Sequence, residues 1–327
     1  MSRLESNNTL TDGCGRKINY LRISVTDLCN LRCKYCMPKE GVSKLSHEKI
    51  MSIEEMAQIS RILAGIGIDK IRITGGEPLV KKGITRLISE IAQNANVKDI
   101  AMTTNGILLR KYAKKLREAG LKRVNISLDT LDARKYSQIT RGGDLLQVLD
   151  GIEQAKRAGL SPIKINTVLI GGFNDDEIED FVRMTMEEEI DVRFIELMPI
   201  GQAAGWSSKN FISNRAVLEK FPGLKKCNPS DKSSPAEYYR LEGAKGKVGL
   251  INPISCKFCD DCNRIRLTSD GKLKLCLHSD YEIDIINPFR RGEDIKEIVV
   301  NELSKKPKSH HLEDGDIIKR NMVQIGG

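Results

Sequence analysis

SVTDLCNLRCKYC, residues 24–36, is the stretch of the sequence that decides the fold. It follows an apolar, strand-like run over residues 20–25 and places Cys29, Cys33 and Cys36 at the spacing Cx3Cx2C. Three thiolates this close can converge on one metal centre, but an ordinary iron–sulfur cluster needs four. A [4Fe-4S] cube on this set would keep one iron open for a small ligand. An open position is typical of catalytic rather than structural metal sites.

Two other interpretations of these cysteines are weaker. A zinc site lacks a fourth ligand, because no histidine is adjacent and His47 is distant in the sequence. A disulfide scaffold is disfavoured by the odd count of nine cysteines and by the lack of an apolar secretory segment at the N-terminus. Free thiols without such a segment predict a reducing, cytoplasmic location.

Composition restricts the class of protein and of partner. Hydrophobic residues make up 40% of the 327 residues and aromatic residues 5%, which predicts a large and mostly aliphatic core. No apolar run approaches the roughly 18 residues of a membrane-spanning helix, so no membrane partner is expected. The net charge of +9 favours an anionic partner, either a nucleic acid or a phosphorylated small molecule, and composition alone leaves both open.

Strand-like and helix-like segments alternate along residues 20–197. Short apolar runs, typical of buried strands, occur at 20–25, 70–74, 99–103, 123–128, 162–169 and 191–197. Helical patterns separate them at about 53–64, 84–93, 110–118, 145–158 and 175–188. This order predicts a parallel α/β fold, although periodicity does not separate an open sheet from a barrel. In such barrels the functional groups collect at the C-terminal ends of the strands.

Two further signals accompany these strands. Gly75-Gly76-Glu77-Pro78 follows the second strand, where glycines let the backbone approach a ligand closely; taken alone, it also fits an ordinary tight turn. Cations interrupt the apolar strands, and because burying an unpaired cation is costly, they face either solvent or an anion. Those that would suit a triphosphate if they face the interior are Arg22, Arg72, Lys164 and Arg193.

A second group of cysteines lies where the regular alternation has ended: Cys256, Cys259, Cys262 and Cys276. All four could form a closed zinc site. The alternative is the Cx2Cx13C set of the last three, which could hold a second cluster with an open iron. Arg264 and Arg266 alternate on the strand-like run between them, so both face one side, and their planar guanidinium groups suit phosphate and guanine acceptors.

The Cx3CxYC set after a first strand, with Gly-Gly-Glu-Pro after the second, resembles the signature of the radical S-adenosylmethionine (SAM) enzymes. The resemblance implies a partial (βα)6 TIM-like barrel and a cluster on Cys29, Cys33 and Cys36 whose fourth iron binds SAM. In that family an electron from the cluster cleaves SAM to a 5′-deoxyadenosyl radical. The residues expected at SAM are Tyr35, Gly76, Glu77, Ser127 and Met198. For Met198, core packing is a nearly equal alternative.

Residues 258–277 match the pattern FCxxCNRxRLTxxGxLxxCL and resemble one radical SAM family, the GTP 3′,8-cyclases of molybdenum cofactor biosynthesis. The resemblance implies SAM, two [4Fe-4S] clusters and a terminal Gly326-Gly327 that reaches into the active site and is needed for activity. Cys256 departs from the pattern, and spacing favours Cys259 as the first ligand of the second cluster, with Cys262 and Cys276. The residues expected to bind GTP are Arg22, Arg72, Thr103, Lys164, Arg193, Arg264, Ile265 and Arg266.

The resemblance also implies a reaction and its partners. The radical would take hydrogen from C3′ of GTP, which would cyclise onto C8 to give (8S)-3′,8-cyclo-7,8-dihydroguanosine 5′-triphosphate, the first step towards molybdopterin. A cyclic pyranopterin monophosphate synthase would consume the product, an electron donor would reduce the protein, and a homodimer is expected, without nucleic acid. Two alternatives remain: a radical SAM enzyme with an auxiliary cluster that modifies a peptide or RNA, and a non-catalytic zinc protein that binds nucleic acid.

We expect three parts: a flexible N-terminal segment at 1–15, a radical SAM partial barrel at 16–221 and a C-terminal cluster-binding region at 222–327 that ends in the Gly-Gly tail. Residues 222–236 are rich in Lys, Ser and Pro, which predicts a linker or exposed loop. His310 and His311 are expected to be solvated, and Cys14 and Cys227 have no assigned role.

Overall fold

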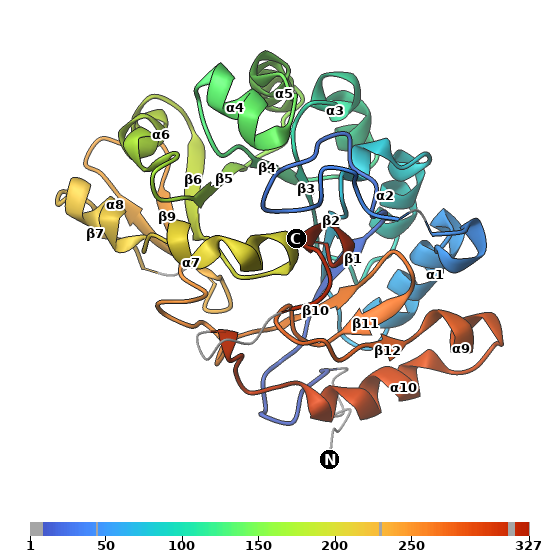
Figure 1. Ribbon diagram of the computed structural model, residues 1–327. Coiled ribbons are helices and arrows are strands. Elements are labelled where there is room, and N and C mark those ends of the chain that lie inside the picture. The colour runs from blue at the N-terminus through green and yellow to red at the C-terminus, as the bar shows by residue number, and fades with distance from the viewer. Residues whose placement is uncertain (1–8, 44, 229–230, 313–317, 327) are drawn as a thin grey trace.

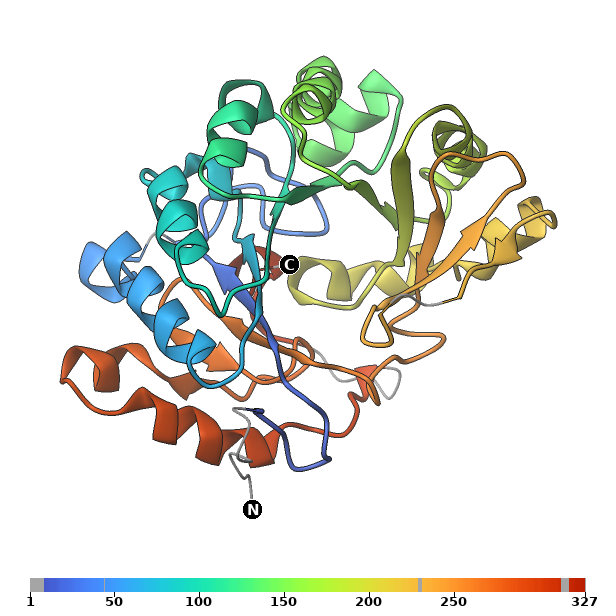
Figure 2. The ribbon, with the colours of Figure 1, turned by 180° about the vertical axis from the view of Figure 1, so that it is seen from behind.

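The computed structural model describes residues 9–43, 45–228, 231–312 and 318–326. One curved sheet runs through the molecule, with helices along its outer side and the end of the chain near its middle (Figures 1 and 2). Its strands are β1 Tyr20–Ser24, β2 Lys70–Thr74, β3 Asp99–Thr104, β4 Arg123–Ser127, β5 Ile163–Leu169, β6 Ile190–Glu196, β7 Lys225–Lys226, β8 Ala236–Arg240, β9 Val248–Ile251, β10 Arg264–Leu267, β11 Lys272–Lys274 and β12 Ile283–Asp284.

The helices between and after these strands are α1 Ile53–Ala64, α2 Ile84–Ala92, α3 Leu109–Glu118, α4 Ala133–Thr140, α5 Leu145–Arg157, α6 Ile178–Glu187, α7 Ser207–Asn210, α8 Arg215–Lys220, α9 Ile286–Arg290 and α10 Ile295–Glu302. Helix α1 begins with a capping box, in which Ser52 and Glu55 exchange hydrogen bonds between side chain and backbone. Among the described residues no helix combines the length and the apolar character needed to cross a membrane.

The sheet order is β12-β11-β10-β1-β2-β3-β4-β5-β6-β9-β8-β7. Strands β1 to β6 are parallel neighbours, as the prediction of a partial (βα)6 barrel requires. The chain after residue 221 then extends both edges, because β9 joins β6 and β10 joins β1, each in parallel. Strands from both sides of residue 221 therefore share one sheet. The domain boundary proposed at that residue stays a prediction.

Alternation along each strand sorts apolar from charged side chains. In β1, Leu21 and Ile23 are fully buried in the main hydrophobic core, whereas Arg22 lines a cavity on the inner side of the sheet. In β10, Ile265 is buried in that core, and Arg264 and Arg266 line the cavity. The outer side of the sheet therefore carries the hydrophobic core under the helices, and the inner side carries the polar cavity.

Two segments differ from expectation. Residues 1–8 lie outside the described part, but part of the segment expected to be flexible is packed: Leu10 is 2% exposed, and the buried Asp12 accepts hydrogen bonds from the backbone of Cys14 and Arg16, whereas residues 13–15 are exposed. Residues 222–236 are also not a plain loop, because β7 pairs with β8 there as an antiparallel hairpin. In both places hydrogen bonds to residues nearby in the sequence order part of a polar segment.

Candidate functional site

One cavity on the inner side of the sheet is lined by both predicted cysteine triplets: Cys29, Cys33, Cys36, Cys259, Cys262 and Cys276. The first triplet lies in the loop after β1, and the second brackets β10 and β11. Cys256 is exposed and does not line the cavity. This geometry agrees with Cys259, rather than Cys256, as the first ligand of the second set, which stays a prediction.

The first cysteine loop rests on the glycines after β2. The backbone N–H of Gly76 donates to Thr26 O at 2.7 Å, and a Cβ at Gly76 would lie 2.3 Å from Leu28 O, so only glycine allows this approach. Glu77 is fully buried behind the loop and is not part of the cavity wall. The close contact therefore fixes the cysteine loop against the β2 turn.

The buried carboxylate of Glu77 positions a side chain that the sequence did not single out. It accepts hydrogen bonds from Thr104 Oγ1 at 2.8 Å and from the backbone N–H of Asn105 at 2.7 Å. Asn105 in turn donates from Nδ2 to Cys29 Sγ at 3.7 Å. Burial raises the pKa of Glu77 to about 7, and these donors oppose the increase. Glu77 therefore affects the first cysteine triplet through Asn105, whereas Gly76 itself lines the cavity.

The two cysteine sets differ in electrostatic environment. Burial raises the pKa of the Cys29 thiol to about 11 and that of Cys36 to about 12. In the second set burial raises the pKa of Cys259, whereas at Cys262 the charges of Arg264 and Lys306 outweigh burial and lower the pKa to about 7. Buried thiolates need a compensating positive charge. In the first set an iron–sulfur cube would provide it. In the second set Arg264 and Lys306 already provide part of it at Cys262.

These donor sets fit two cubes of the type that the sequence predicts. Among the described residues, no three His, Cys, Asp or Glu side chains converge on the position of a single metal ion. A [4Fe-4S] cube instead takes each cysteine on a different iron, so its ligands surround a larger body. Cys29, Cys33 and Cys36 would hold one cube and Cys259, Cys262 and Cys276 the other, each with three thiolates.

Most of the residues predicted to contact SAM line the cavity beside the first triplet: Tyr35, Gly76, Ser127 and Met198. The Tyr35 hydroxyl donates to Asp129 Oδ2 at 2.7 Å, which orients the ring. Burial raises the pKa of Asp129 to about 6. Thr103 also lines the cavity, and its buried hydroxyl has no hydrogen-bond partner in the described part of the chain.

Three arginines form one row across neighbouring strands. In the strand register Arg22 of β1 lies opposite both Arg72 of β2 and Arg266 of β10. Burial, then repulsion from Arg266 and Arg72, lowers the pKa of Arg22, and burial lowers that of Arg266 to about 10. Such a row is unfavourable unless an anion is present.

Two more arginines point unpaired donors into the same space. Arg193 is 6% exposed, and its buried Nε and Nη2 have no partner among the described residues. Arg264 has the same two nitrogens unpaired, and its guanidinium lies over the ring of Phe258 at 5.1 Å from the centroid. Buried guanidinium donors are expensive to leave unsatisfied, so these groups are prepared for a ligand that brings acceptors.

The chain's last described residue reaches this row. Gly326 has φ +67°, and its carbonyl accepts hydrogen bonds from Arg266 Nη1 at 2.7 Å and Arg22 Nη2 at 3.3 Å. Ile325 and Val323 are each 1% exposed, which anchors the preceding turn. A backbone hydrogen bond from Val323 also reaches the Cys36 thiol. Gly327 lies outside the described residues, so its expected role stays a prediction.

Two predicted GTP ligands are placed elsewhere. Lys164 donates to Asp191 Oδ2 and to the Tyr238 hydroxyl, both at 2.9 Å, and does not line the cavity. Its charge is therefore already paired within the protein. The Ile265 side chain is fully buried in the hydrophobic core, so only its backbone could face a ligand.

Other side chains at the cavity were not found from sequence. His278 and His310 line it with ring centroids 4.2 Å apart, and His278 Nε2 lies 3.2 Å from Met198 Sδ. The expectation that His310 is solvated is wrong, since it is 5% exposed; His311 is exposed as expected. Burial, then His310 and Arg266, lowers the pKa of His278 to about 2, so the ring is neutral.

The loop before the second triplet is also held by a buried acid. Glu196, at the end of β6, is fully buried and accepts hydrogen bonds from the backbone of Ile254 at 3.1 Å and Ser255 at 3.0 Å. Glu196 therefore holds the loop before the second triplet through backbone hydrogen bonds, as Glu77 holds the backbone of Asn105 beside the first triplet. A carboxylate at the end of a predicted strand was the available sequence signal.

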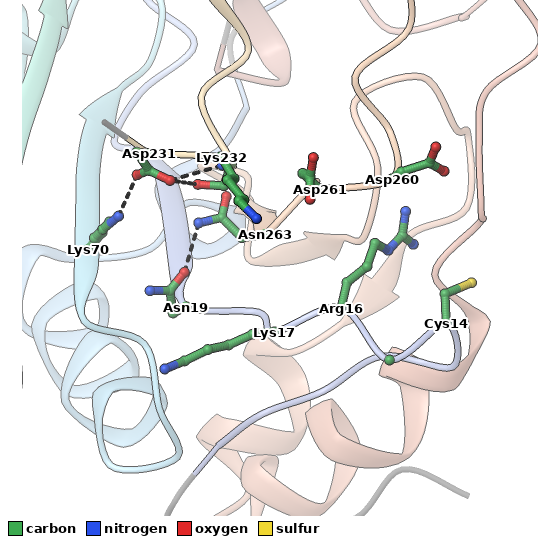
Figure 3. Close-up of a pocket in the computed structure, with 12 residues that line it drawn as sticks. Cys14, Arg16, Lys17, Asn19, Lys70, Asp231, Lys232, Asp260, Asp261 and Asn263 are labelled. Atoms are coloured by element: carbon green, nitrogen blue, oxygen red, sulfur yellow. Dashed lines mark hydrogen bonds and ion pairs between the residues drawn. The ribbon is translucent and has the colours of Figure 1, made fainter. Parts of the chain in front are cut away.

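A second hollow lies beside the N-terminal ends of β1 and β2 (Figure 3). There Lys70 pairs with Asp231 at 2.8 Å, and Asn263 donates to Asn19 Oδ1 at 2.7 Å. None of the predicted site residues lines it. The chemistry-bearing side chains therefore gather in the cysteine cavity.

Comparison with solved structures identifies the fold. Streptococcus suis SuiB bound to the precursor peptide SuiA superimposes with a TM-score of 0.60 at 13% identity, over 97% of this chain and 77% of that one. SuiB bound to S-adenosylmethionine gives a TM-score of 0.56 at 14% identity, with the same coverage. At such low identity the likeness shows the fold alone.

Sequence comparison extends over nearly the whole chain. Residues 23–185 match the Radical SAM superfamily and residues 190–312 match Molybdenum Cofactor Synthesis C. The GTP 3′,8-cyclase of Peptoclostridium acidaminophilum is 62% identical over 99% of this chain and all of that protein. The GTP 3′,8-cyclase of Alkaliphilus oremlandii is 56% identical over 97% of this chain and all of that protein. The chain therefore belongs to the GTP 3′,8-cyclase family within the radical SAM superfamily.

Proposed function

We propose that this protein converts GTP to (8S)-3′,8-cyclo-7,8-dihydroguanosine 5′-triphosphate in the first step of molybdenum cofactor biosynthesis. The observation that carries the proposal is the single cavity with two cysteine triplets on its wall and five arginines, Arg22, Arg72, Arg193, Arg264 and Arg266, among its lining residues. The curated relatives at 62% and 56% identity are named for this reaction.

The arginines favour a polyphosphate over a neutral substrate. Arg72 forms no ion pair with a described acid, and its Nε donates only to the Tyr20 hydroxyl at 2.5 Å. Arg193 keeps two buried donors unpaired. Guanidinium forks bind phosphate oxygens in pairs, so a triphosphate would satisfy these donors and relieve their mutual repulsion. We therefore assign the triphosphate to Arg22, Arg72 and Arg193.

The guanine would lie towards the second triplet. Arg264 is stacked on Phe258, and Arg266 is fixed by the carbonyl of Gly326, so both present donors at defined positions. A planar donor pair suits the acceptor atoms of a purine. The C-terminal tail, whose last described residue is Gly326, would restrict the reacting ribose from the side opposite the base.

When bound, the first cluster and SAM supply the 5′-deoxyadenosyl radical that removes hydrogen from C3′ of GTP. The protein's own residues hold the reactants. Tyr35, Gly76, Ser127 and Met198 would contact SAM, and the arginine row would hold the nucleotide so that C3′ faces the radical and C8 lies within reach of C3′. Fixing three reacting centres in this way is the main catalytic contribution that a protein can make to a radical ring closure.

The setting of the reaction is part of the same proposal. A cyclic pyranopterin monophosphate synthase would take the product. A protein electron donor would supply two electrons, one to cleave SAM at the first cluster and one that, with a proton, reduces the radical left after closure onto C8. All nine cysteines are free, which favours a reducing compartment, the cytoplasm. We also propose a homodimer, which sedimentation of the purified protein would test.

The decisive experiment is anaerobic turnover with SAM, a chemical reductant and GTP deuterated at C3′. We expect 5′-deoxyadenosine to form only with GTP and to carry the deuterium, together with one cyclised nucleotide per deoxyadenosine. The Cys29→Ala variant should form neither. Deoxyadenosine that forms equally fast without GTP, or that carries no deuterium, would exclude the cyclase and favour another radical SAM substrate.

A further inference from the structure

A buried ammonium ties together the two halves of the second cysteine set. Lys306, which follows α10 and the short turn Leu303–Lys305, is 4% exposed. Its Nζ donates to Arg264 O at 2.9 Å and to Leu275 O. Arg264 stands two residues after Cys262, and Leu275 directly precedes Cys276. One side chain therefore fixes the separation of the two segments that carry these cysteines.

The charge of Lys306 has no partner of the usual kind. No acid in the described part of the chain lies within ion-pair distance of it, and Arg16 and Arg264 are close enough to oppose its charge. Arg16 is itself neutralised by Asp12 at 2.6 Å. Burial above all lowers the pKa of Lys306, and the groups that oppose this shift are the thiols of Cys262 and Cys276.

A second buried lysine shows the ordinary arrangement. Lys274 is fully buried on β11, and its Nζ lies 3.2 Å from the carboxylate of Glu282 and 2.5 Å from Ser279 O. Its charge is balanced within the protein, so it needs no further ligand. An uncompensated buried ammonium costs several kcal/mol, as an order of magnitude. Since no described acid balances Lys306, a negative body at the second cysteine set would stabilise its charged form.

We propose that Lys306 is a positioning residue of the second iron–sulfur cluster, holding its ligand segments in place and raising its reduction potential through a fixed positive charge. The inference rests on the proposed function, because it presupposes a cluster on Cys259, Cys262 and Cys276. Three thiolates outweigh the positive charge of the oxidised cube, and reduction adds one more negative charge. A nearby cation stabilises the reduced state more than the oxidised state, so the potential rises.

The test is a redox titration of the anaerobic holoenzyme followed by EPR, in which variants lacking one cysteine triplet assign each signal. Lys306→Met removes charge and hydrogen bonds, and Lys306→Gln removes the charge but keeps a donor. Lys305→Met is the matched control: it removes the same charge one residue away, where the side chain is exposed and pairs with Glu302 at 2.8 Å.

We expect both Lys306 variants to lower the potential of the second cluster and to leave that of the first unchanged, and Lys305→Met to move neither. Iron release to a chelator from the second site should be faster in Lys306→Met than in Lys306→Gln. An unchanged second potential in Lys306→Gln, or equal shifts in both clusters, would overturn the proposal. Wild-type protein without iron at the second triplet would instead overturn the proposed function, so the two failures are distinguishable.

Discussion

Replacing Gly326 by alanine should release the end of the chain from the arginine row. Gly326 adopts φ +67°, and a Cβ there would lie 2.4 Å from Thr74 Oγ1 and 3.2 Å from Ser24 Cβ. The left-handed conformation costs alanine about 1–2 kcal/mol relative to glycine. The overlap also displaces the Thr74 hydroxyl, whose hydrogen bond to Ile23 O at 3.1 Å is worth about 1 kcal/mol.

The sum, about 2–3 kcal/mol, lowers the docked population of the tail by up to roughly 30- to 150-fold. Because the docked Gly326 carbonyl holds Arg266 and Arg22, we expect the rate of GTP-dependent cyclisation to fall by a similar factor. Product formation under anaerobic conditions measures the rate, and a thermal melt measures stability, which should change little because only the chain end is released.

Two comparisons separate local overlap from strain. Gly292→Ala imposes alanine on φ +79° where no atom lies within 4 Å of the new Cβ, so it should leave the rate unchanged. Against a Thr74→Ala background the overlapping oxygen is gone, so Gly326→Ala should retain the strain and the 3.2 Å contact with Ser24 Cβ, and the loss should fall towards roughly 5- to 30-fold. The reasoning is refuted if Gly326→Ala cyclises GTP within twofold of the unsubstituted protein.

Three other perturbations test separate parts of the site. Cys256→Ala should keep both clusters and Cys259→Ala should lose one, which iron and sulfide analysis measures. A loss of iron in Cys256→Ala would reverse the ligand assignment. Arg193→Met removes a buried unpaired charge, so we expect a higher melting temperature without GTP and a KM for GTP raised roughly 10- to 100-fold, and an unchanged KM would contradict the phosphate assignment. Burial raises the pKa of Glu77 from 4.5 to about 7, so the folded protein binds more protons at this carboxyl than the unfolded chain does. The contribution of Glu77 to the free energy of unfolding therefore falls as pH rises from about 4.5 to about 7. Denaturant titrations should show the protein losing stability relative to Glu77→Gln over that range, and parallel pH profiles would contradict the burial argument.

The strands could be predicted from sequence because each is a short aliphatic run bounded by turn residues. All six predicted strands agree with β1 to β6 within one residue at each end. Helix α4 was missed, although Asp132 caps it by accepting from the backbone of Arg134 and Lys135. Its pattern is short and mostly polar, so the hydrophobic period that indicates a helix is weak.

The site residues that belong to a sequence motif could be predicted. Those whose role depends on how neighbouring strands pair could not. Lys164 and Arg193 look alike as cations in apolar strands, but β5 pairs Lys164 with Asp191 of β6, and this neutralises one of the two. His278 and His310 meet only because the C-terminal region folds back over the cavity, and no local pattern reports such a contact. Positions that depend on partners far along the chain therefore need the tertiary structure.

The pairing of β1 with β10 also has a consequence for biosynthesis. β1 emerges early from the ribosome, yet its neighbour on one side, Arg264–Leu267, is translated only when most of the chain has been made. Until then one edge of an apolar strand exposes its peptide groups, and such edges pair readily with other nascent chains. Co-translational folding can proceed from β1 to β6, but this edge of β1 stays open until β10 pairs with it.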